Sequence, residues 1–267
     1  MELAGRVAVV TGGGNGIGAA MARRFAAEGA AGVLVADLDE MAARRVADEL
    51  VSAGVAAVAR RVDVADRPAV EAMLDAAEEA LGPVELVCSN AGIGTAQGIE
   101  ADLATWTRAW DVNVMAHVHA AHAALPRMLE RGHGALVNTC SAAGLLTMVG
   151  DAPYTATKHA AVGFAEWLAI TYGNRGIHVS ALCPQGVETN LLSQGTGSVS
   201  EQAVRLAGPV LTPEEVADAV VAGLRDERFL ILPHPDVGVH LRRKGADPQR
   251  WIEALTAIAA HLGADGR

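Results

Sequence analysis

The sequence predicts an α/β fold, in which a doubly wound, mostly parallel sheet of seven strands carries helices on both faces. Three observations lead to this prediction. Short apolar runs typical of buried strands alternate with helical patterns about seven times along the chain. The composition is 51% hydrophobic but only 3% aromatic, which suits helices packed closely on a sheet through small aliphatic side chains. No linker-like segment, repeat or low-complexity tract interrupts the pattern, so 267 residues indicate one large domain rather than two small ones.

The predicted strands are short apolar segments that end at glycine or a polar residue. They are residues 6–11, 33–36, 55–62, 85–89, 134–140, 177–183 and 229–232. The predicted helices are residues 19–28, 41–52, 68–81, 102–131, 153–174 and 213–224. Thr212 and Pro213 begin the last of these as N-cap and first helical residue. Residues 186–209, which include Gly195-Thr-Gly-Ser198, follow the carboxyl end of a strand and are expected to form a mobile loop beside a ligand site.

A glycine-rich turn connects the first strand to the first helix, with the sequence Thr-Gly-Gly-Gly-Asn-Gly-Ile-Gly at residues 11–18. Gly12 permits a tight turn, Gly16 lets the backbone approach a pyrophosphate, and Gly18 lets the helix pack against the strand. Free N–H groups at the helix start would hold the phosphates. A tight turn without a ligand is the alternative, but the number of glycines favours a dinucleotide site. The expected cofactor contacts here are Gly12, Asn15, Gly16, Ile17 and Gly18.

Asp37 ends the second predicted strand, the position where an acid accepts hydrogen bonds from the ribose 2′-hydroxyl of an adenine dinucleotide. A carboxylate there would repel a 2′-phosphate, and no arginine or lysine replaces Asn15 or Leu38 to bind one. The sequence therefore favours NAD over NADP. Asp37 is equally compatible with a role as N-cap of the helix that begins near Glu40.

Tyr154 and Lys158 lie four residues apart in a predicted helix, so their side chains share one face. A nearby ammonium favours phenolate and lowers a pKa that is about 10 when unperturbed. That would make the tyrosine usable as an acid and base near neutral pH. The spacing alone arises often by chance, and its weight comes from the other motifs.

Several motifs in order resemble those of the short-chain dehydrogenase/reductase family, over about residues 4–232. The matching segments are Thr11-Gly-x-x-x-Gly-x-Gly18, Asp63-Val64, Asn90-Ala91-Gly92, Asn113, Ser141, Tyr154-x-x-x-Lys158 and Pro184-x-x-Val187-x-Thr189. Their spacing also agrees, including the 13 residues from Ser141 to Tyr154. The resemblance implies a Rossmann-like fold and hydride transfer between NAD(H) and a secondary alcohol or ketone.

The resemblance also implies roles for particular residues. Tyr154 would be the acid/base, and Ser141 would hydrogen-bond the carbonyl or alkoxide oxygen. Lys158 would bind the nicotinamide ribose and lower the pKa of Tyr154, and Asn113 would position a water in a proton relay. The expected cofactor contacts outside the glycine turn are Asp37, Leu38, Asp63, Val64, Asn90, Ala91, Gly92, Tyr154, Lys158, Pro184, Val187 and Thr189.

Two departures from the family pattern limit this inference. Gln185 stands where the family usually has glycine, which changes the surface beside the nicotinamide. Many members also end after the seventh strand, whereas here residues 233–267 continue with a basic stretch at 242–244 and a predicted helix at 248–261. Residues 1–232 are therefore expected to form the dinucleotide-binding and catalytic domain. The extension is expected to pack on the same domain, over the substrate opening or in subunit contacts.

The segments expected to line the substrate pocket, residues 144–149 and 187–199, are rich in leucine, valine and methionine and contain no lysine or arginine. Since sites for carboxylates or phosphates usually present a cation, we expect a neutral, hydrophobic alcohol or ketone. Arg205 or the basic tail could fold over the pocket and change this. The expected substrate contacts are Ser141, Leu146, Tyr154, Gln185 and Leu191.

The composition excludes several other classes. A net charge of −10 argues against nucleic acid or an anionic membrane as partner, and no apolar run approaches the roughly 20 residues of a membrane span. The three cysteines have no metal-ligand spacing, and His117 and His119 lie about 200° apart on a helix, so no metal site is expected. We expect a cytoplasmic homodimer or homotetramer. The alternative function is a catalytically silent NAD-binding regulatory or scaffold protein of the same fold.

Overall fold

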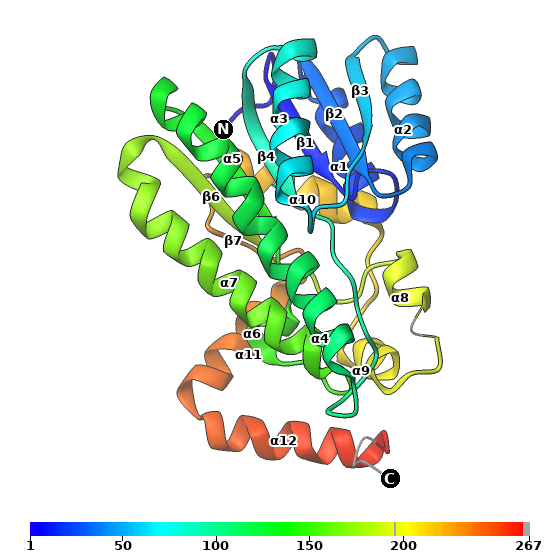
Figure 1. Ribbon diagram of the computed structural model, residues 1–267. Helices are drawn as coiled ribbons and strands as arrows, with labels where there is room; N and C mark the ends of the chain where they lie inside the picture. Colours follow the sequence, from blue (N-terminus) through cyan, green and yellow to red (C-terminus); the bar gives the residue numbers. More distant parts are fainter. Residues whose placement is uncertain (195, 264–267) are drawn as a thin grey trace.

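A parallel sheet forms the centre of the molecule (Figure 1). The computed structural model describes residues 1–194 and 196–263, and within them seven strands are arranged in the order β3-β2-β1-β4-β5-β6-β7. The strands are β1 (Val7–Thr11), β2 (Gly32–Asp37), β3 (Ala56–Arg61), β4 (Val84–Ser89), β5 (Gly134–Thr139), β6 (Ile177–Leu182) and β7 (Leu230–Ile231). Every strand pair in this sheet is parallel, so the predicted fold class is confirmed.

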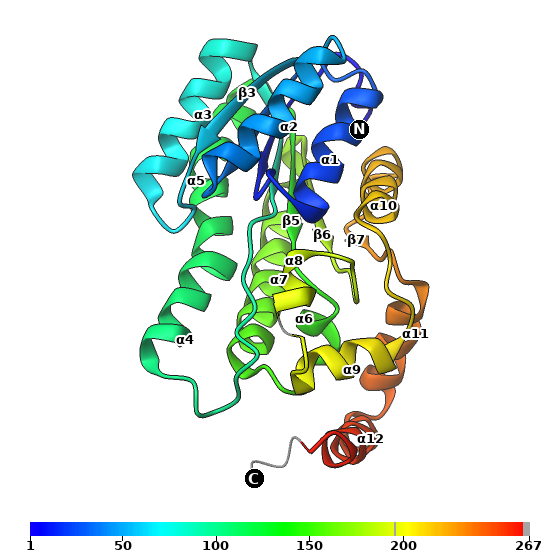
Figure 2. The ribbon, with the colours of Figure 1, turned by 90° about the vertical axis from the view of Figure 1, so that its right-hand side faces the viewer.

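The sheet is covered on both faces, which is why its central strands are apolar throughout rather than alternating. One face carries α1 (Gly16–Ala27), α2 (Glu40–Ser52) and α10 (Pro213–Arg225). The opposite face carries α3 (Arg67–Leu81), α5 (Ala116–Arg131) and α7 (Ala152–Tyr172), and α7 ends in a 3-10 turn (Gly173–Arg175). Figure 2 shows α1 and α10 on one side of the sheet and α3 and α5 on the other. The hydrophobic core on each face of the sheet is rich in alanine and valine, which lets the helices approach the strands closely.

The helix predicted at 102–131 is interrupted. It consists of α4 (Leu103–Trp110), a π-helical turn (Asp111–Met115) and α5, with helical backbone angles at both junctions. The π-turn contains Asn113, and single π-turns often occur at functional positions in helices. A hydrophobic pattern does not distinguish such a turn from a regular helix.

Residues 186–209 do not form one irregular loop, so this part of the expectation is wrong, while the mobility of the segment stays a prediction. They contain α8 (Asn190–Gln194) and α9 (Val199–Ala207), and Ser198 caps α9 by accepting a hydrogen bond from the Glu201 N–H. Gly195, part of the glycine stretch in this segment, lies outside the described residues. Gly195 and Gly197, on either side of Thr196, hid the short helices from a reading of composition.

The C-terminal extension contains two helices, α11 (Pro235–Ala246) and α12 (Pro248–His261). The second coincides with the predicted helix, while α11 includes the basic stretch and was not predicted. Both lie at the end of the molecule near the short helix α6 (Ala143–Leu146), as Figure 1 shows. Residues 264–267 lie outside the described part of the chain.

None of the helices in the described ranges combines the length and the apolar character that a membrane crossing requires.

Candidate functional site

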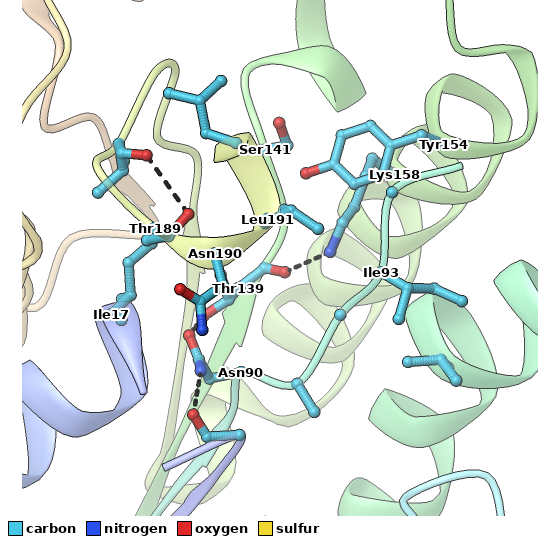
Figure 3. A pocket seen from close by; sticks show the side chains of 18 of the residues that line it. Ile17, Asn90, Ile93, Thr139, Ser141, Tyr154, Lys158, Thr189, Asn190 and Leu191 are labelled. Carbon is cyan, nitrogen blue, oxygen red and sulfur yellow. Dashed lines mark hydrogen bonds between the residues drawn. The ribbon is translucent and has the colours of Figure 1, made fainter. Parts of the chain in front are cut away.

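A cavity of about 730 Å³ opens along the carboxyl ends of β1, β2, β4, β5 and β6. This is the edge where open α/β sheets bind their ligands. Its wall is assembled from the glycine turn, the segment after β4, the segment after β5, the start of α7 and the segment after β6. Figure 3 shows Ser141, Tyr154 and Lys158 pointing into the same part of this cavity.

The glycine turn has the geometry that the sequence predicts. Gly12 and Gly16 have φ angles of +62° and +51°, which other residues rarely adopt. A Cβ atom on Gly18 would lie 2.1 Å from the carbonyl oxygen of Gly12, so only glycine lets α1 begin this close to β1. The first N–H groups of α1 are therefore presented at the mouth of the cavity, ready to bind an anion.

Asp37 lines the cavity at the end of β2 and is held in place by the backbone. Its Oδ2 accepts a hydrogen bond from the Gly14 N–H at 2.9 Å, and its Oδ1 accepts one from the Asp39 N–H at 3.0 Å. The N-cap of α2 is Asp39, whose carboxylate accepts from the Ala42 N–H. The N-cap alternative for Asp37 is therefore wrong, and its carboxylate is fixed beside the glycine turn.

Asn90 joins the ends of three strands. Its Nδ2 donates to the carbonyl oxygen of Thr11 at 3.1 Å, and its Oδ1 accepts from the Thr139 hydroxyl at 3.1 Å. The amide is therefore engaged in fixing β1, β4 and β5 relative to one another, and Asn90 shapes the cavity floor (Figure 3).

Asp151 connects the start of α7 to the segment after β4. As N-cap of α7 it accepts from the Tyr154 N–H at 3.0 Å. The same carboxylate accepts from the Thr95 N–H and hydroxyl at 2.8 and 2.6 Å and from the Ala96 N–H at 2.7 Å. The position of Tyr154 is thus tied directly to the segment after β4, which also lines the cavity.

Tyr154 is nearly buried, with 8% of its surface exposed. Burial raises the pKa of Tyr154 to about 12, and the neighbouring Ser141 hydroxyl opposes this rise only in part. The phenol is therefore protonated near neutral pH in the protein alone. The prediction that its pKa is depressed is wrong for this state, because the pattern Tyr-x-x-x-Lys carries no information about desolvation.

Lys158 lies one turn further along α7 and is 2% exposed. Its Nζ donates to the carbonyl oxygen of Thr139 at 2.9 Å and lies 5.6 Å from the centre of the Tyr154 ring. Burial lowers the pKa of Lys158. The two side chains share one face and one cavity, as their spacing predicts.

Asn113 has a fully buried side chain whose amide is engaged. Its Oδ1 accepts from the Ile93 N–H at 2.9 Å, and its Nδ2 donates to the Ile93 carbonyl at 2.9 Å and to the Thr157 hydroxyl at 3.1 Å. The side chain fixes the segment after β4 against α7. It does not line the cavity.

Most of the other residues predicted from the motifs also line the cavity. They are Asn15, Ile17, Leu38, Asp63, Val64, Ala91, Gly92, Pro184, Val187 and Thr189. Gly18 does not line the cavity, and its lack of a side chain lets α1 pack closely against β1. At the far end of the cavity Arg108 of α4 pairs with Asp63 through two contacts of 3.2 and 3.3 Å. The sequence had no motif that singled out Arg108.

The comparisons with known proteins agree with these motifs. The sequence profile of the short chain dehydrogenase family matches residues 6–197. The chain belongs to this family. It is 37% identical to 1-deoxy-11-beta-hydroxypentalenate dehydrogenase of Streptomyces exfoliatus, across 94% of this chain and 91% of the relative. It is 34% identical to cyclohexanol dehydrogenase of an Acinetobacter species, across 85% and 90%.

Solved structures show the same family relationship. A short-chain dehydrogenase/reductase from Burkholderia phymatum in complex with NAD superposes with a TM-score of 0.85 at 33% identity, covering 93% of this chain and 96% of that one. A 7 alpha-hydroxysteroid dehydrogenase complexed with NADH and 7-oxo glycochenodeoxycholic acid gives a TM-score of 0.80 at 28% identity, covering 86% and 93%.

The residues predicted to contact substrate in this family member fall into two groups. Ser141, Tyr154, Gln185 and Leu191 line the cavity. Leu146 does not, because α6 turns its side chain into the hydrophobic core, where it is 7% exposed. Met148 and Leu192, which lie in the segments expected to line the substrate pocket, also line the cavity. Further cavity residues that the sequence did not indicate are Ile93, Gly94, Thr95, Ala96, Ser200, Glu201 and Val204.

Gln185, the departure from the family glycine, is held by its backbone. The Gln185 N–H donates to Nδ1 of His234 at 3.2 Å, and Nε2 of the same ring lies 3.2 Å from the Pro209 carbonyl, to which it donates. His234 is almost completely buried and connects the two ends of the segment that carries α8 and α9.

The three histidines after the π-turn lie in different surroundings. His117 is 1% exposed, and burial lowers its pKa to about 3. His119 contacts the carbonyl of Val64, and His122 lies 3.3 Å from Arg67. In the described ranges no three histidine, cysteine or acidic side chains gather as metal ligands would.

Proposed function

We propose that this protein is an NAD-dependent dehydrogenase that interconverts neutral, hydrophobic secondary alcohols and ketones. The observation that carries the proposal is the convergence of Ser141, Tyr154 and Lys158 on one wall of a cavity whose other end holds the glycine turn and Asp37. The names of the relatives, which include a cyclohexanol dehydrogenase and a 1-deoxy-11-beta-hydroxypentalenate dehydrogenase, support oxidation of a hydroxyl group.

The residues around the cavity fit NAD. The start of α1 offers N–H groups for the pyrophosphate, and the absent Cβ of Gly18 lets α1 begin close to β1 so that these groups reach the cavity. The Asp37 carboxylate stands where an adenosine ribose would present its hydroxyls. When bound, the cofactor accepts a hydride at its nicotinamide ring or donates one from it.

The protein's own part in the reaction is to orient the substrate and move one proton. In alcohol oxidation the Tyr154 oxygen takes the hydroxyl proton, while the Ser141 hydroxyl hydrogen-bonds the substrate oxygen. The Lys158 ammonium is held by its hydrogen bond to the Thr139 carbonyl, and from there it would bind the ribose of the nicotinamide half of NAD. Asn113 holds the segment around Ile93 in place. Because its side-chain amide is already engaged there, we assign the water-positioning role that the family resemblance implies to groups around Asn113 and not to this amide.

The proton balance requires a change in Tyr154 on cofactor binding. Since burial alone raises its pKa to about 12, the phenolate must gain a compensating positive charge. The Lys158 ammonium is the fixed positive charge nearest to Tyr154, and the positively charged nicotinamide ring would add to it when NAD is bound.

A neutral substrate is supported by the charges around the cavity. Among the described lining residues the cations are Lys158, which donates to the Thr139 carbonyl and would bind the cofactor ribose, and Arg108, which pairs with Asp63. Arg205, which we considered as a possible substrate cation, pairs with Glu201 at 2.8 Å. Apolar side chains also line the cavity, among them Ile93, Met148 and Leu191.

The test of the proposed function is NADH formation with a panel of secondary alcohols. We expect kcat/KM for neutral cyclic or aliphatic alcohols to exceed that for hydroxy acids of similar size by at least about tenfold, because no free cation would pair with the carboxylate. A preference for the hydroxy acids would contradict the assigned substrate class. NAD binding without turnover of any alcohol or ketone would favour the regulatory or scaffold alternative.

Cofactor choice is tested at Asp37. Replacing Asp37 by serine and Leu38 by arginine removes the repulsion and adds a phosphate partner, so the ratio of kcat/KM for NADP to that for NAD should rise by about 10²-fold. Leu38→Arg alone is the matched control and should give a smaller rise, because the carboxylate remains. Equal use of NADP and NAD by the wild-type protein would show that Asp37 does not select the cofactor.

We also propose that copies of the chain associate as a dimer or tetramer. Apolar side chains on α4 and α7 are exposed in the single chain, among them Leu103, Trp167 and Ile170. Light scattering of the purified protein measures the state directly, and a monomer at micromolar concentration would contradict this.

A further inference from the structure

We propose that Lys244 and Trp251, in the C-terminal helices, are positioning residues that brace the cavity wall between Ser141 and Met148. The proposal rests on the proposed function, because it assigns these residues to the alignment of substrate with Ser141 and Tyr154. It concerns α11 and α12, which lie outside the residues that the family profile matches.

The chain contains only two lysines, Lys158 and Lys244, and both hold backbone carbonyls near Ser141. Lys158 donates to the carbonyl of Thr139, two residues before Ser141, at 2.9 Å. Lys244 donates to the carbonyl of Leu145, four residues after it, at 2.6 Å. The two ammonium groups therefore bracket Ser141 along the chain, one from α7 and one from the extension.

The segment that Lys244 holds needs external support. Helix α6 has only four residues, too few to be stable alone, and its last carbonyls lack partners within the helix. Lys244 binds one of them, and the Trp251 indole Nε1–H donates to the next, the carbonyl of Leu146, at 3.2 Å. A cation is also favourable at this end of a helix.

Strain at the following residue indicates that the support is structurally required. Thr147 has a φ of +75°, which is rare for a β-branched side chain and persists only where its surroundings hold it. On one side of Thr147 are the contacts from Lys244 and Trp251. On the other side the Thr155 hydroxyl binds both the N–H and the carbonyl of Met148, each at 3.1 Å.

The two sets of contacts are connected through His159. Its Nδ1–H donates to the carbonyl of Thr155 at 2.9 Å, which leaves Nε2 as an acceptor 3.5 Å from the Lys244 ammonium. Thr155 directly follows Tyr154, and Met148 lines the cavity. Lys244 therefore joins the extension to the turn of α7 that carries Tyr154 and to the segment that carries Met148. Figure 1 shows α11 beside α6, with α12 beyond it.

The test uses the double variant Lys244→Met/Trp251→Phe, which removes both donors and keeps side chains of similar size. We expect faster hydrogen exchange at the amides of residues 142–149, with exchange across residues 12–18 unchanged. KM for the best alcohol should rise by about five- to tenfold, while the NAD dissociation constant stays within about twofold. Lys244→Arg keeps a charged donor at this position, so the changes in hydrogen exchange and KM should be smaller than in the double variant. Arg243→Met is the matched control, because it removes an exposed charge in the same turn of α11. It should leave the hydrogen exchange, KM and the NAD dissociation constant unchanged.

The outcomes separate this proposal from the proposed function. Unchanged exchange at 142–149 in the double variant would overturn the brace, whatever the activity. Faster exchange over the whole chain would overturn it as well, because the extension would then act on general stability. If the wild-type protein oxidised no alcohol, the local exchange result would still decide whether the brace exists, while the proposed function would fail independently.

Discussion

Replacing Tyr154 by phenylalanine is expected to lower kcat/KM for alcohol oxidation by about 10²- to 10⁴-fold, the usual contribution of a positioned acid or base. The ring remains to fill its buried position, so folding and NAD affinity should stay close to wild type. Only the hydroxyl beside Ser141 is lost. Steady-state kinetics with the best alcohol and an NAD binding titration measure the two effects separately.

The chain offers a matched control, because it has only two tyrosines. Tyr172, at the other end of α7, packs edge-on against Trp167 and is remote in sequence from the cavity segments. Tyr172→Phe should retain nearly full activity. Activity retained in Tyr154→Phe would show that another group transfers the proton.

Replacing Lys158 by methionine is expected to have the second largest effect. It leaves the buried Thr139 carbonyl without its donor, which costs about 1–3 kcal/mol of stability. It also removes the nearest fixed positive charge from Tyr154, 5.6 Å from the ring centre. The remaining activity should be at least about tenfold lower, with weaker cofactor binding.

The pH response of this variant follows from the sign of the shift at Tyr154. Burial raises the pKa to about 12, so the phenol form dominates below it, and oxidation requires the deprotonated base. Alcohol oxidation should therefore rise with pH and then level off, while ketone reduction falls over the same interval. In Lys158→Met the rise should move to higher pH, and Lys158→Arg should recover it only in part. A profile of kcat/KM against pH that does not move in Lys158→Met would mean that the two side chains are not coupled.

The sequence predicted the layout of the sheet because the buried strands and the glycine turn are local signals. The run of apolar residues at β1 and the glycines that follow leave few alternatives for that segment. The π-turn at Asn113 was not predictable, because one additional residue in a helical turn does not change the apolar pattern. Helices α8, α9 and α11 are short or strongly polar and are stabilised by contacts with other parts of the molecule.

The candidate site was predictable where one residue type serves one role, as at Ser141, Tyr154 and Lys158. Predictions failed where the answer depends on orientation or burial. Leu146 lies in the right segment, but the turn of α6 directs it into the core. The direction of the pKa shift at Tyr154 depends on desolvation that only the folded structure reveals.

The most direct test of the central claim follows a labelled hydride. The best alcohol from the panel, carrying deuterium at the carbinol carbon, is incubated with NAD and the wild-type protein, and the reduced cofactor is analysed by mass spectrometry and NMR. The proposal that Tyr154 and this cavity catalyse hydride transfer predicts deuterium at C4 of the nicotinamide, on a single face of the ring, and transfer slowed by at least about 10²-fold in a parallel incubation with Tyr154→Phe. Tight NAD binding with no deuterium transferred by the wild-type protein would contradict it.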